Sequence, residues 1–287
     1  MSGPASSMRF ADGRLHLQHG PIDCIVEAVG DHDEIDAAYA QATRRFEDIL
    51  PVLVGELAVL RTPVGAAYPL VRGPVAKRMV SAAWPYRDVF ITPMAAVAGA
   101  VADEVLAAMV VGRTLHKAYV NNGGDIALHL NGYAEFNVGI ASDPCRYMLD
   151  GGLTVHSIDP VRGVATSGWQ GRSQSLGIAD AVTVLAANAA AADAAATMIA
   201  NAVNVDHPAI HRVPAGELKE DSDLGDLPVT VAVGALPQEA VDAALTAGLA
   251  CALELCSRDL IEDALLNLAG HWRAVRDRHG LYLNARC

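Results

Sequence analysis

Strand-like and helix-like segments come in separate blocks along this chain, and that order restricts the fold more than any other feature. Alternating apolar residues predict strands within residues 8–28 and 118–158, and again at 181–186 and 228–233. Apolar residues at helical spacing predict helices over residues 31–50, 74–84, 92–112, 189–203 and 238–278. Blocks of this kind are typical of α+β proteins rather than doubly wound parallel ones. We therefore expect an α+β fold in which antiparallel sheet layers pack against helices.

The composition favours one domain with a core of small side chains. The chain has 287 residues, of which 52% are hydrophobic but only 5% are aromatic. Alanine and valine carry most of the apolar content, and a chain of this length can bury a sizeable core. We see no linker and no repeat. A single domain over residues 1–287 is the expectation.

The net charge and the cysteines indicate which binding partners and which cellular compartment to expect for this protein. The net charge is −12, which disfavours binding to the phosphate backbone of nucleic acid. We find no basic and apolar leader at the N-terminus and no apolar run of the roughly 20 residues that a membrane span needs. The five cysteines form no CxxC pair, so reduced thiols and a cytoplasmic location are expected. We expect a small-molecule substrate, and the alanine-rich helices are compatible with a homodimer.

The segment Asn121-Asn122-Gly123-Gly124-Asp125 follows a predicted strand. Paired glycines allow positive φ and a close approach of backbone to a ligand, and the flanking amides and carboxylate offer donors and acceptors. Asn-Gly is also the commonest hairpin signal, so a plain turn is the alternative. We take these five residues as cofactor-binding candidates.

A second small motif is Thr166-Ser167-Gly168, followed by Arg172 and Ser173. Small hydroxyl residues and a glycine can form a backbone nest for an anion, and Arg172 adds a possible phosphate or carboxylate contact. A simple turn beside a surface arginine is the alternative.

Asp193 and Thr197 lie four residues apart in an alanine-rich helix, so their side chains share one face. A buried carboxylate is costly unless it is paired or binds a cation. A carboxylate with a hydroxyl is hard-oxygen ligation of the kind that suits magnesium. Alternatively, Asp193 hydrogen-bonds backbone groups as a buried cap.

A polar loop over residues 204–227 holds possible catalytic groups. Histidine exchanges protons near neutral pH and can act as an acid or base. Exposed loop residues that are merely solvated are the alternative. Our catalytic candidates are Ser173, His207, His211, Arg212 and Asp223.

Four motifs occur in an order that resembles the ApbE-like superfamily. They are Gly99-Ala100-Val101-Ala102-Asp103, then Asn121 to Asp125, then Thr166-Ser167-Gly168, then Ala192-Asp193-Ala194-Ala195-Ala196-Thr197. Characterised members of that superfamily are magnesium-dependent FAD:protein FMN transferases. The resemblance implies an ApbE-type α+β domain, with Asp193 and Thr197 as Mg2+ ligands. It also implies that the Gly-Gly turn and Thr-Ser-Gly wall a pocket for FAD or FMN.

Two departures from the superfamily pattern shape the functional expectation. Ala98 stands where transferases usually carry a lysine, and residues 171–180 lack their histidine-rich segment. This pattern looks more like an uncharacterised branch. We therefore expect an enzyme of the hydrolase or lyase type, acting where the Gly-Gly turn, Thr-Ser-Gly and the His207/His211 loop meet. The alternatives are a Mg2+-dependent FAD:protein FMN transferase and a non-catalytic flavin-binding protein.

Overall fold

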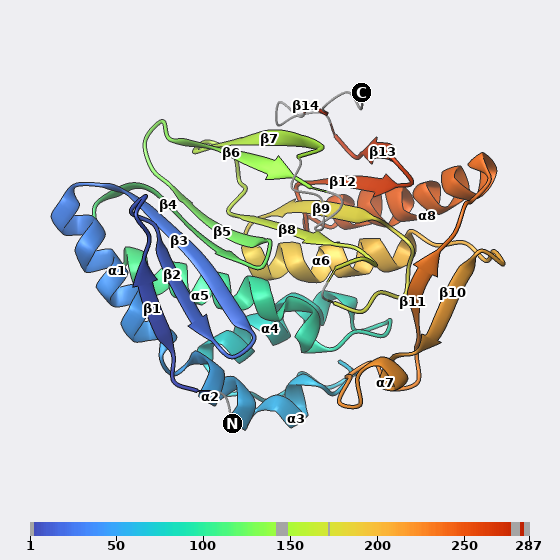
Figure 1. Cartoon of the computed structure of the whole chain (residues 1–287), viewed down its shortest axis with the longest axis horizontal. Helices are drawn as coiled ribbons and strands as arrows, with labels where there is room; N and C mark the ends of the chain where they lie inside the picture. Colours follow the sequence, from blue (N-terminus) through green and yellow to red (C-terminus); the bar gives the residue numbers. More distant parts are fainter. Residues whose placement is uncertain (1–2, 142–148, 172, 277–281, 284–287) are drawn as a thin grey trace. The chain divides into compact units, whose positions relative to one another are not determined.

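A computed structural model describes residues 3–141, 149–171, 173–276 and 282–283 of the chain (Figure 1). The described residues group into two compact units, each discontinuous in sequence. The first unit comprises residues 1–135, 156–165 and 186–194, and the second comprises 136–155, 166–185 and 195–287. The expectation of a single domain stays a prediction.

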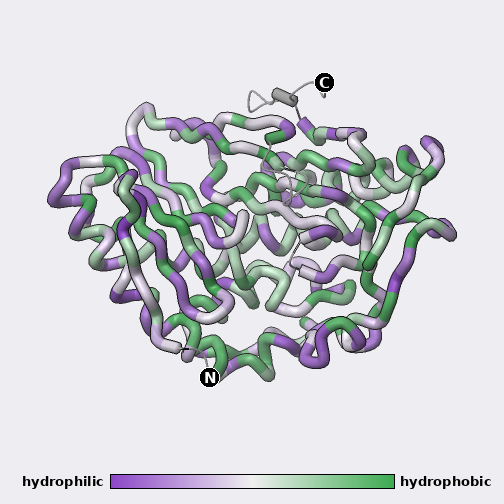
Figure 2. Tube along the Cα trace, in the orientation of Figure 1, coloured by the Kyte–Doolittle hydropathy of each residue, from purple (hydrophilic) through white to green (hydrophobic). Residues whose placement is uncertain are grey.

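The first unit is built on an antiparallel sheet. Its strands follow one another in sheet order as β1 (Ser6–Arg9), β2 (Leu15–His19), β3 (Ile22–Gly30), β4 (Leu115–Asn122) and β5 (Asp125–Leu130). Beside β5 lies the start of β8 (Gly163–Ser167). Every second residue of β2 is buried, as are alternate residues along most of β3. Figure 2 shows hydrophilic and hydrophobic residues alternating along these strands. The predicted hairpin around Asp12-Gly13 is confirmed.

Helices cover this sheet. The long ones are α1 (His32–Phe46) and α5 (Val97–Val110), and α5 packs on β4, β5 and α1. Shorter ones are α2 (Ile49–Gly55), α3 (Leu57–Leu60), α4 (Pro74–Ala83), η1 (Trp84–Tyr86) and η2 (Pro93–Ala96). Thr92 accepts a hydrogen bond from the Met94 N–H, so the predicted cap before Pro93 is confirmed.

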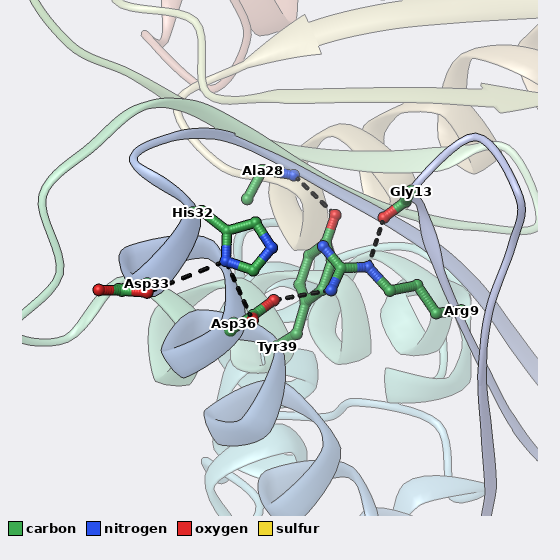
Figure 3. A network of polar contacts seen from close by, with 7 residues as sticks. All are labelled: Arg9, Gly13, Ala28, His32, Asp33, Asp36 and Tyr39. Carbon is green, nitrogen blue, oxygen red and sulfur yellow. Dashed lines mark hydrogen bonds and ion pairs between the residues drawn. The ribbon is translucent and has the colours of Figure 1, made fainter.

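A polar network fastens the exposed edge strand β1 to α1 (Figure 3). Arg9 donates to Asp36 over 2.7 Å and to the Gly13 carbonyl over 3.2 Å. Its guanidinium also lies 5.1 Å from the ring centre of Tyr39, whose hydroxyl accepts the Ala28 N–H. Each exposed contact contributes modestly. Together they hold an edge strand whose four residues are all exposed.

The second unit contains three small groups of strands. In the first, β12 (Asp263–Leu268) pairs antiparallel with both β9 (Ala181–Ala186) and β13 (His271–Ala274), and α8 (Gln238–Ser257) packs on β12. The second is a ribbon of β10 (Ile210–Pro214) and β11 (Pro228–Val233), joined through α7 (Ala215–Leu218). The third comprises β6 (Glu135–Ile140), β7 (Gly151–His156) and β14 (Tyr282–Leu283). Helix α6 (Ala189–Ala202) has its first six residues in the first unit.

The α+β class is confirmed, but three local predictions were wrong. Strands β6 and β7 do not continue a meander from β5, because β8 pairs with β5 instead. The loop over 204–227 contains β10 and α7. Residues 263–274 form strands rather than helix, and all six residues of β12 are buried. A short, fully buried apolar run cannot be assigned to helix or strand from periodicity alone.

Two helical stretches, Pro93–Val110 and Gln238–Ser257, are long and apolar enough to cross a membrane by composition. The first contains α5, which packs on β4 and β5, and the second is α8, which packs on β12. Core helices have the same composition, so both are accounted for as core elements of their units. The expected absence of a membrane partner stays a prediction.

Candidate carboxylate site

The motif at residues 121–125 forms a two-residue hairpin turn between β4 and β5. Asn122 pairs with Asp125 across the ladder, and Gly123 and Gly124 have φ values of 67° and 115°. The Gly124 N–H donates to the Asn121 side chain over 2.8 Å. Glycine adopts such angles without strain. The plain-turn interpretation is therefore correct for the two glycines, which are exposed.

The residues flanking this turn face inward. Asn122 and Asp125 are only 5% and 9% exposed. The Asn122 side-chain amide donates to the Ala98 carbonyl over 3.1 Å. This hydrogen bond ties the hairpin to the first turn of α5.

Helix α6 brings Asp193 to the same turn of α5. The Gly99 N–H donates to Asp193 Oδ2 over 3.0 Å. A Cβ atom added to Gly99 would lie 2.2 Å from the Ala189 carbonyl oxygen, so only glycine allows the two helices to approach this closely. Asp193 therefore caps the start of α5, as the capping interpretation predicted.

The capping is reciprocal. Asp103, one turn after Gly99 on α5, accepts hydrogen bonds from the Ala189 and Ala190 N–H groups over 3.0 and 2.9 Å. Asn188 accepts the Ala191 N–H over 2.8 Å. The first three N–H donors of α6 are thus satisfied within the protein, so this helix start is not free to bind an anion. The Gly99-to-Asp103 motif is a helix-docking device, and its Asp103 was not among the predicted site residues.

The electrostatics of Asp193 differ from those of an ordinary cap. Burial raises the pKa of Asp193 well above its usual range, and the negative charge of Asp125 raises it further. Backbone hydrogen bonds from Gly99 and Ala98 oppose this rise without cancelling it, and Asp103 adds to it. Although part of its surface is solvent-accessible, the protein surrounds the carboxyl closely enough for desolvation to dominate. Two carboxylates in one shielded place repel each other, and a proton or a cation relieves that repulsion.

The donor set fits a hard divalent cation held by few protein ligands. Asp125 and Asp193 supply carboxylate oxygens. Thr197, the other predicted ligand, is half-buried on α6 and belongs to the second unit. Among the residues that the structure describes, no group of three or more His, Cys, Asp and Glu could hold a metal ion. Mg2+ suits such a set because it keeps several waters and takes phosphate oxygens from its substrate.

In the Thr-Ser-Gly motif, which lies in the second unit, Thr166 and Ser167 end strand β8 and Gly168 opens the turn that follows it. Thr166 and Thr183 hydroxyls are 2.9 Å apart. A Cβ at Gly168 would lie 2.2 Å from the Asp180 carbonyl oxygen, so close packing requires this glycine. Ser173 is exposed, and Arg172 lies outside the described residues.

Asp180 holds this turn and was not predicted. Its Oδ1 accepts hydrogen bonds from the side chains of Trp169 and Gln170, each over 3.1 Å, and its Oδ2 accepts the Ala269 N–H. The only sequence signal was a lone acidic residue directly before a fully buried strand.

The predicted catalytic loop is organised by local contacts. The Ala209 N–H donates to Nδ1 of His207 over 3.1 Å, so the ring caps its own turn. Arg212 donates a hydrogen bond to the side chain of Asn204. An open surface pocket is lined by Asn204, Val205, Asp206 and Arg212. His211 is exposed on β10, and Asp223 is half-buried in the following segment.

Asn121 to Asp125 and Asp193 therefore belong to the first unit. Thr-Ser-Gly, Ser173, Thr197 and the residues of the 204–227 loop belong to the second. Their expected union in one pocket stays a prediction.

Comparisons with known proteins address the family. A family model described as "AbpE bacteria" matches residues 7–274. The chain is 34% identical over 193 residues to a "UPF0280 protein" of Methanothrix thermoacetophila, a match that covers 66% of this chain and 76% of the relative. A "UPF0280 protein" of Methanothermobacter thermautotrophicus is 40% identical over 133 residues, 46% of this chain and 50% of the relative. The match to this second relative thus spans about half its length.

Solved structures give weaker likenesses. The ApbE protein of Thermotoga maritima has a TM-score of 0.43 at 12% identity, covering 94% of this chain and 96% of its own. The flavin transferase ApbE of Vibrio cholerae has a TM-score of 0.41 at 13% identity, covering 96% and 95%. The predicted ApbE-like resemblance is confirmed by the family match, which covers most of the sequence. The chain belongs to the AbpE bacteria family.

Proposed function

We propose that Asp125 and Asp193 hold a divalent cation together with the pyrophosphate of FAD, and that the protein transfers FMN to a hydroxyl acceptor. The observation that carries this proposal is the placement of Asp193. It is a shielded carboxylate whose charged neighbours, Asp125 and Asp103, are anionic and whose hydrogen bonds come from backbone N–H groups. Membership of the family supports a flavin nucleotide as the substrate.

Each residue around the site has a defined part. The backbone N–H groups of Gly99 and Ala98 orient the carboxylate of Asp193. The Asn122 amide holds the Ala98 carbonyl and so orients the backbone that carries Gly99. The hairpin presents Asp125 from the sheet. Thr197, Thr166, Ser167, Gly168 and Arg172 remain proposed contacts to the cation or to the flavin nucleotide.

The proposed reaction is a phosphoryl-type transfer. The acceptor oxygen forms a bond to the FMN phosphorus, the bond from that phosphorus to the bridging oxygen breaks, and AMP leaves with that oxygen. The hydroxyl proton passes to solvent. A bound Mg2+ would supply Lewis-acid stabilisation of the phosphate oxygens. The protein's own part is to orient the two carboxylates before the substrate arrives.

The transferase hypothesis now replaces the expected hydrolase or lyase reaction. That reaction depended on the loop histidines, and the ring of His207 is engaged in its own turn. The family match favours flavin transfer over it. A non-catalytic flavin-binding protein would use the same carboxylates, so turnover is the property to test.

The test incubates the protein with FAD and Mg2+, with either water or a threonine peptide as the acceptor. Chromatography then measures the AMP released. We expect AMP from the wild-type protein and a loss of about 100-fold or more in Asp193→Asn. Asp33→Asn is the matched control, because Asp33 is a fully exposed aspartate in the first turn of α1. Failure of the wild-type protein both to bind FAD and to release AMP would contradict the proposal.

A further inference from the structure

The geometry points to Asp103 as a positioning residue of the carboxylate site, which holds the start of α6 so that Asp193 is presented to its ligand. This inference rests on the proposed function. Asp103 touches neither substrate nor cation in this scheme. It acts on Asp193 through the first turn of the helix that carries it.

The contacts form a closed loop between two helices. Asp103 on α5 binds the N–H groups of Ala189 and Ala190, and Asp193 on α6 binds the N–H of Gly99. Gly99 and Asp103 are four residues apart, so they lie on the same face of α5. A shift of α6 that broke the bonds to Asp103 would also displace the carboxylate of Asp193.

A carboxylate at position 103 does more than a neutral cap. It accepts two hydrogen bonds with both oxygens, and bonds to a charged group are about twice as strong as neutral ones. Its charge also acts directly on Asp193. Asp103 therefore both fixes the helix and adds to the negative field that a cation would enter.

Asn188 provides a matched control for these roles. It caps the same helix start through the Ala191 N–H, but it is neutral and exposed. Removing either cap should cost about 1 kcal/mol of stability. Only the removal of Asp103 should move Asp193.

The experiment compares Asp103→Asn with Asn188→Ala in three measurements. They are the thermal midpoint, the affinity for Mn2+ from electron paramagnetic resonance, and hydrogen exchange of the Gly99 amide. We expect Asp103→Asn to weaken Mn2+ binding about tenfold, as does the loss of a residue that orients a metal ligand. It should also speed exchange at Gly99, while Asn188→Ala lowers the thermal midpoint but leaves the other two unchanged.

Equal changes in both variants, or no change in Asp103→Asn, would overturn the inference. If Asp103→Asn fails to fold, Asp103→Glu keeps the charge and both oxygens but shifts them by one methylene. It should still weaken Mn2+ binding more than Asn188→Ala. If the wild-type protein binds no Mn2+, the proposed function fails, whereas exchange at Gly99 still decides whether Asp103 positions Asp193.

Discussion

Two carboxylates of the first unit, Glu104 on α5 and Asp193 on α6, have pKa values that are shifted in opposite directions. Glu104 accepts hydrogen bonds from Arg45 over 2.9 Å and Arg78 over 3.0 Å. Burial alone would raise the pKa of Glu104, but the two arginines outweigh it and bring the pKa below its ordinary value. Asp193 meets backbone N–H groups and two further carboxylates, and its pKa is raised. The protein neutralises the first carboxylate with its own arginines, and we propose that a cation neutralises the second.

The largest effect on stability should come from Gly99→Ala, which disrupts the close contact of α5 with α6 at the residue that donates to Asp193. The added methyl group meets backbone atoms of Ala189 that cannot rotate away. We expect a loss of about 3 kcal/mol in the free energy of unfolding, measured by denaturant titration. Gly55→Ala is the control, because its methyl group would meet no atom within 4 Å, and it should be neutral or slightly stabilising. A mild effect of Gly99→Ala would mean that the two helices are not so closely docked.

Glu104→Gln should have the next largest effect, because it leaves two arginines without their shared partner. We expect a loss of about 2 kcal/mol at neutral pH, less than for a fully buried pair. Because the folded pKa of Glu104 is lowered, its stabilisation is present above the unfolded value of about 4.5 and is lost as the pH falls through the folded value. The difference from wild type should therefore shrink in acid.

The exposed pair of Glu254 and Arg258 serves as the control for that experiment. Glu254→Gln should change stability by less than about 0.5 kcal/mol at any pH. A Glu104 effect as small as this one would remove the contrast between Glu104 and an ordinary surface pair.

Asp193→Asn should act in the opposite direction in protein stripped of cations. The folded pKa of Asp193 is raised, so its favourable contribution is present below the unfolded value of 3.8 and is lost as the pH rises through the folded value. The variant should therefore unfold at a higher temperature than wild type at neutral and alkaline pH. We expect a rise of roughly 2–4 °C for each kcal/mol gained in a protein of this size. A lower midpoint than wild type would show that Asp193 serves mainly as a cap.

The smallest effect should come from His207→Ala. It removes one local hydrogen bond to the Ala209 N–H, so a loss of about 0.5–1 kcal/mol is expected. AMP release from FAD should be unchanged. A large loss of turnover with normal stability would instead support the hypothesis that the 204–227 loop is catalytic.

Local chemistry made part of the fold and site predictable. The hairpin at Gly123-Gly124 and the cap at Thr92 depend on residues within a few positions of each other, so the sequence carried their signal. Asp193 stood out because it interrupts an alanine-rich, buried helix. Cation binding and backbone capping were the two alternatives for Asp193. The structure shows the capping contact, and cation binding stays a prediction.

Long-range partners explain what was missed. Asp103 meets Ala189 across 86 positions, and Asp180 meets Ala269 across 89. Neither pairing leaves a periodic pattern in the sequence. All six residues of strand β12 are buried and α8 packs on the strand, so buried and exposed residues do not alternate along it. Such features depend on the assembled sheet rather than on local propensity.

The most direct test of the carboxylate site is a Mn2+ titration followed by electron paramagnetic resonance, with Mg2+ as competitor. Wild type, Asp193→Asn and Glu104→Gln would be compared after their folding is verified by thermal melts. We predict one Mn2+ site in wild type that Mg2+ displaces, nearly unchanged affinity in Glu104→Gln, and a loss of about 100-fold in Asp193→Asn. Equal Mn2+ affinity in wild type and Asp193→Asn would contradict the assignment of Asp193 as a cation ligand.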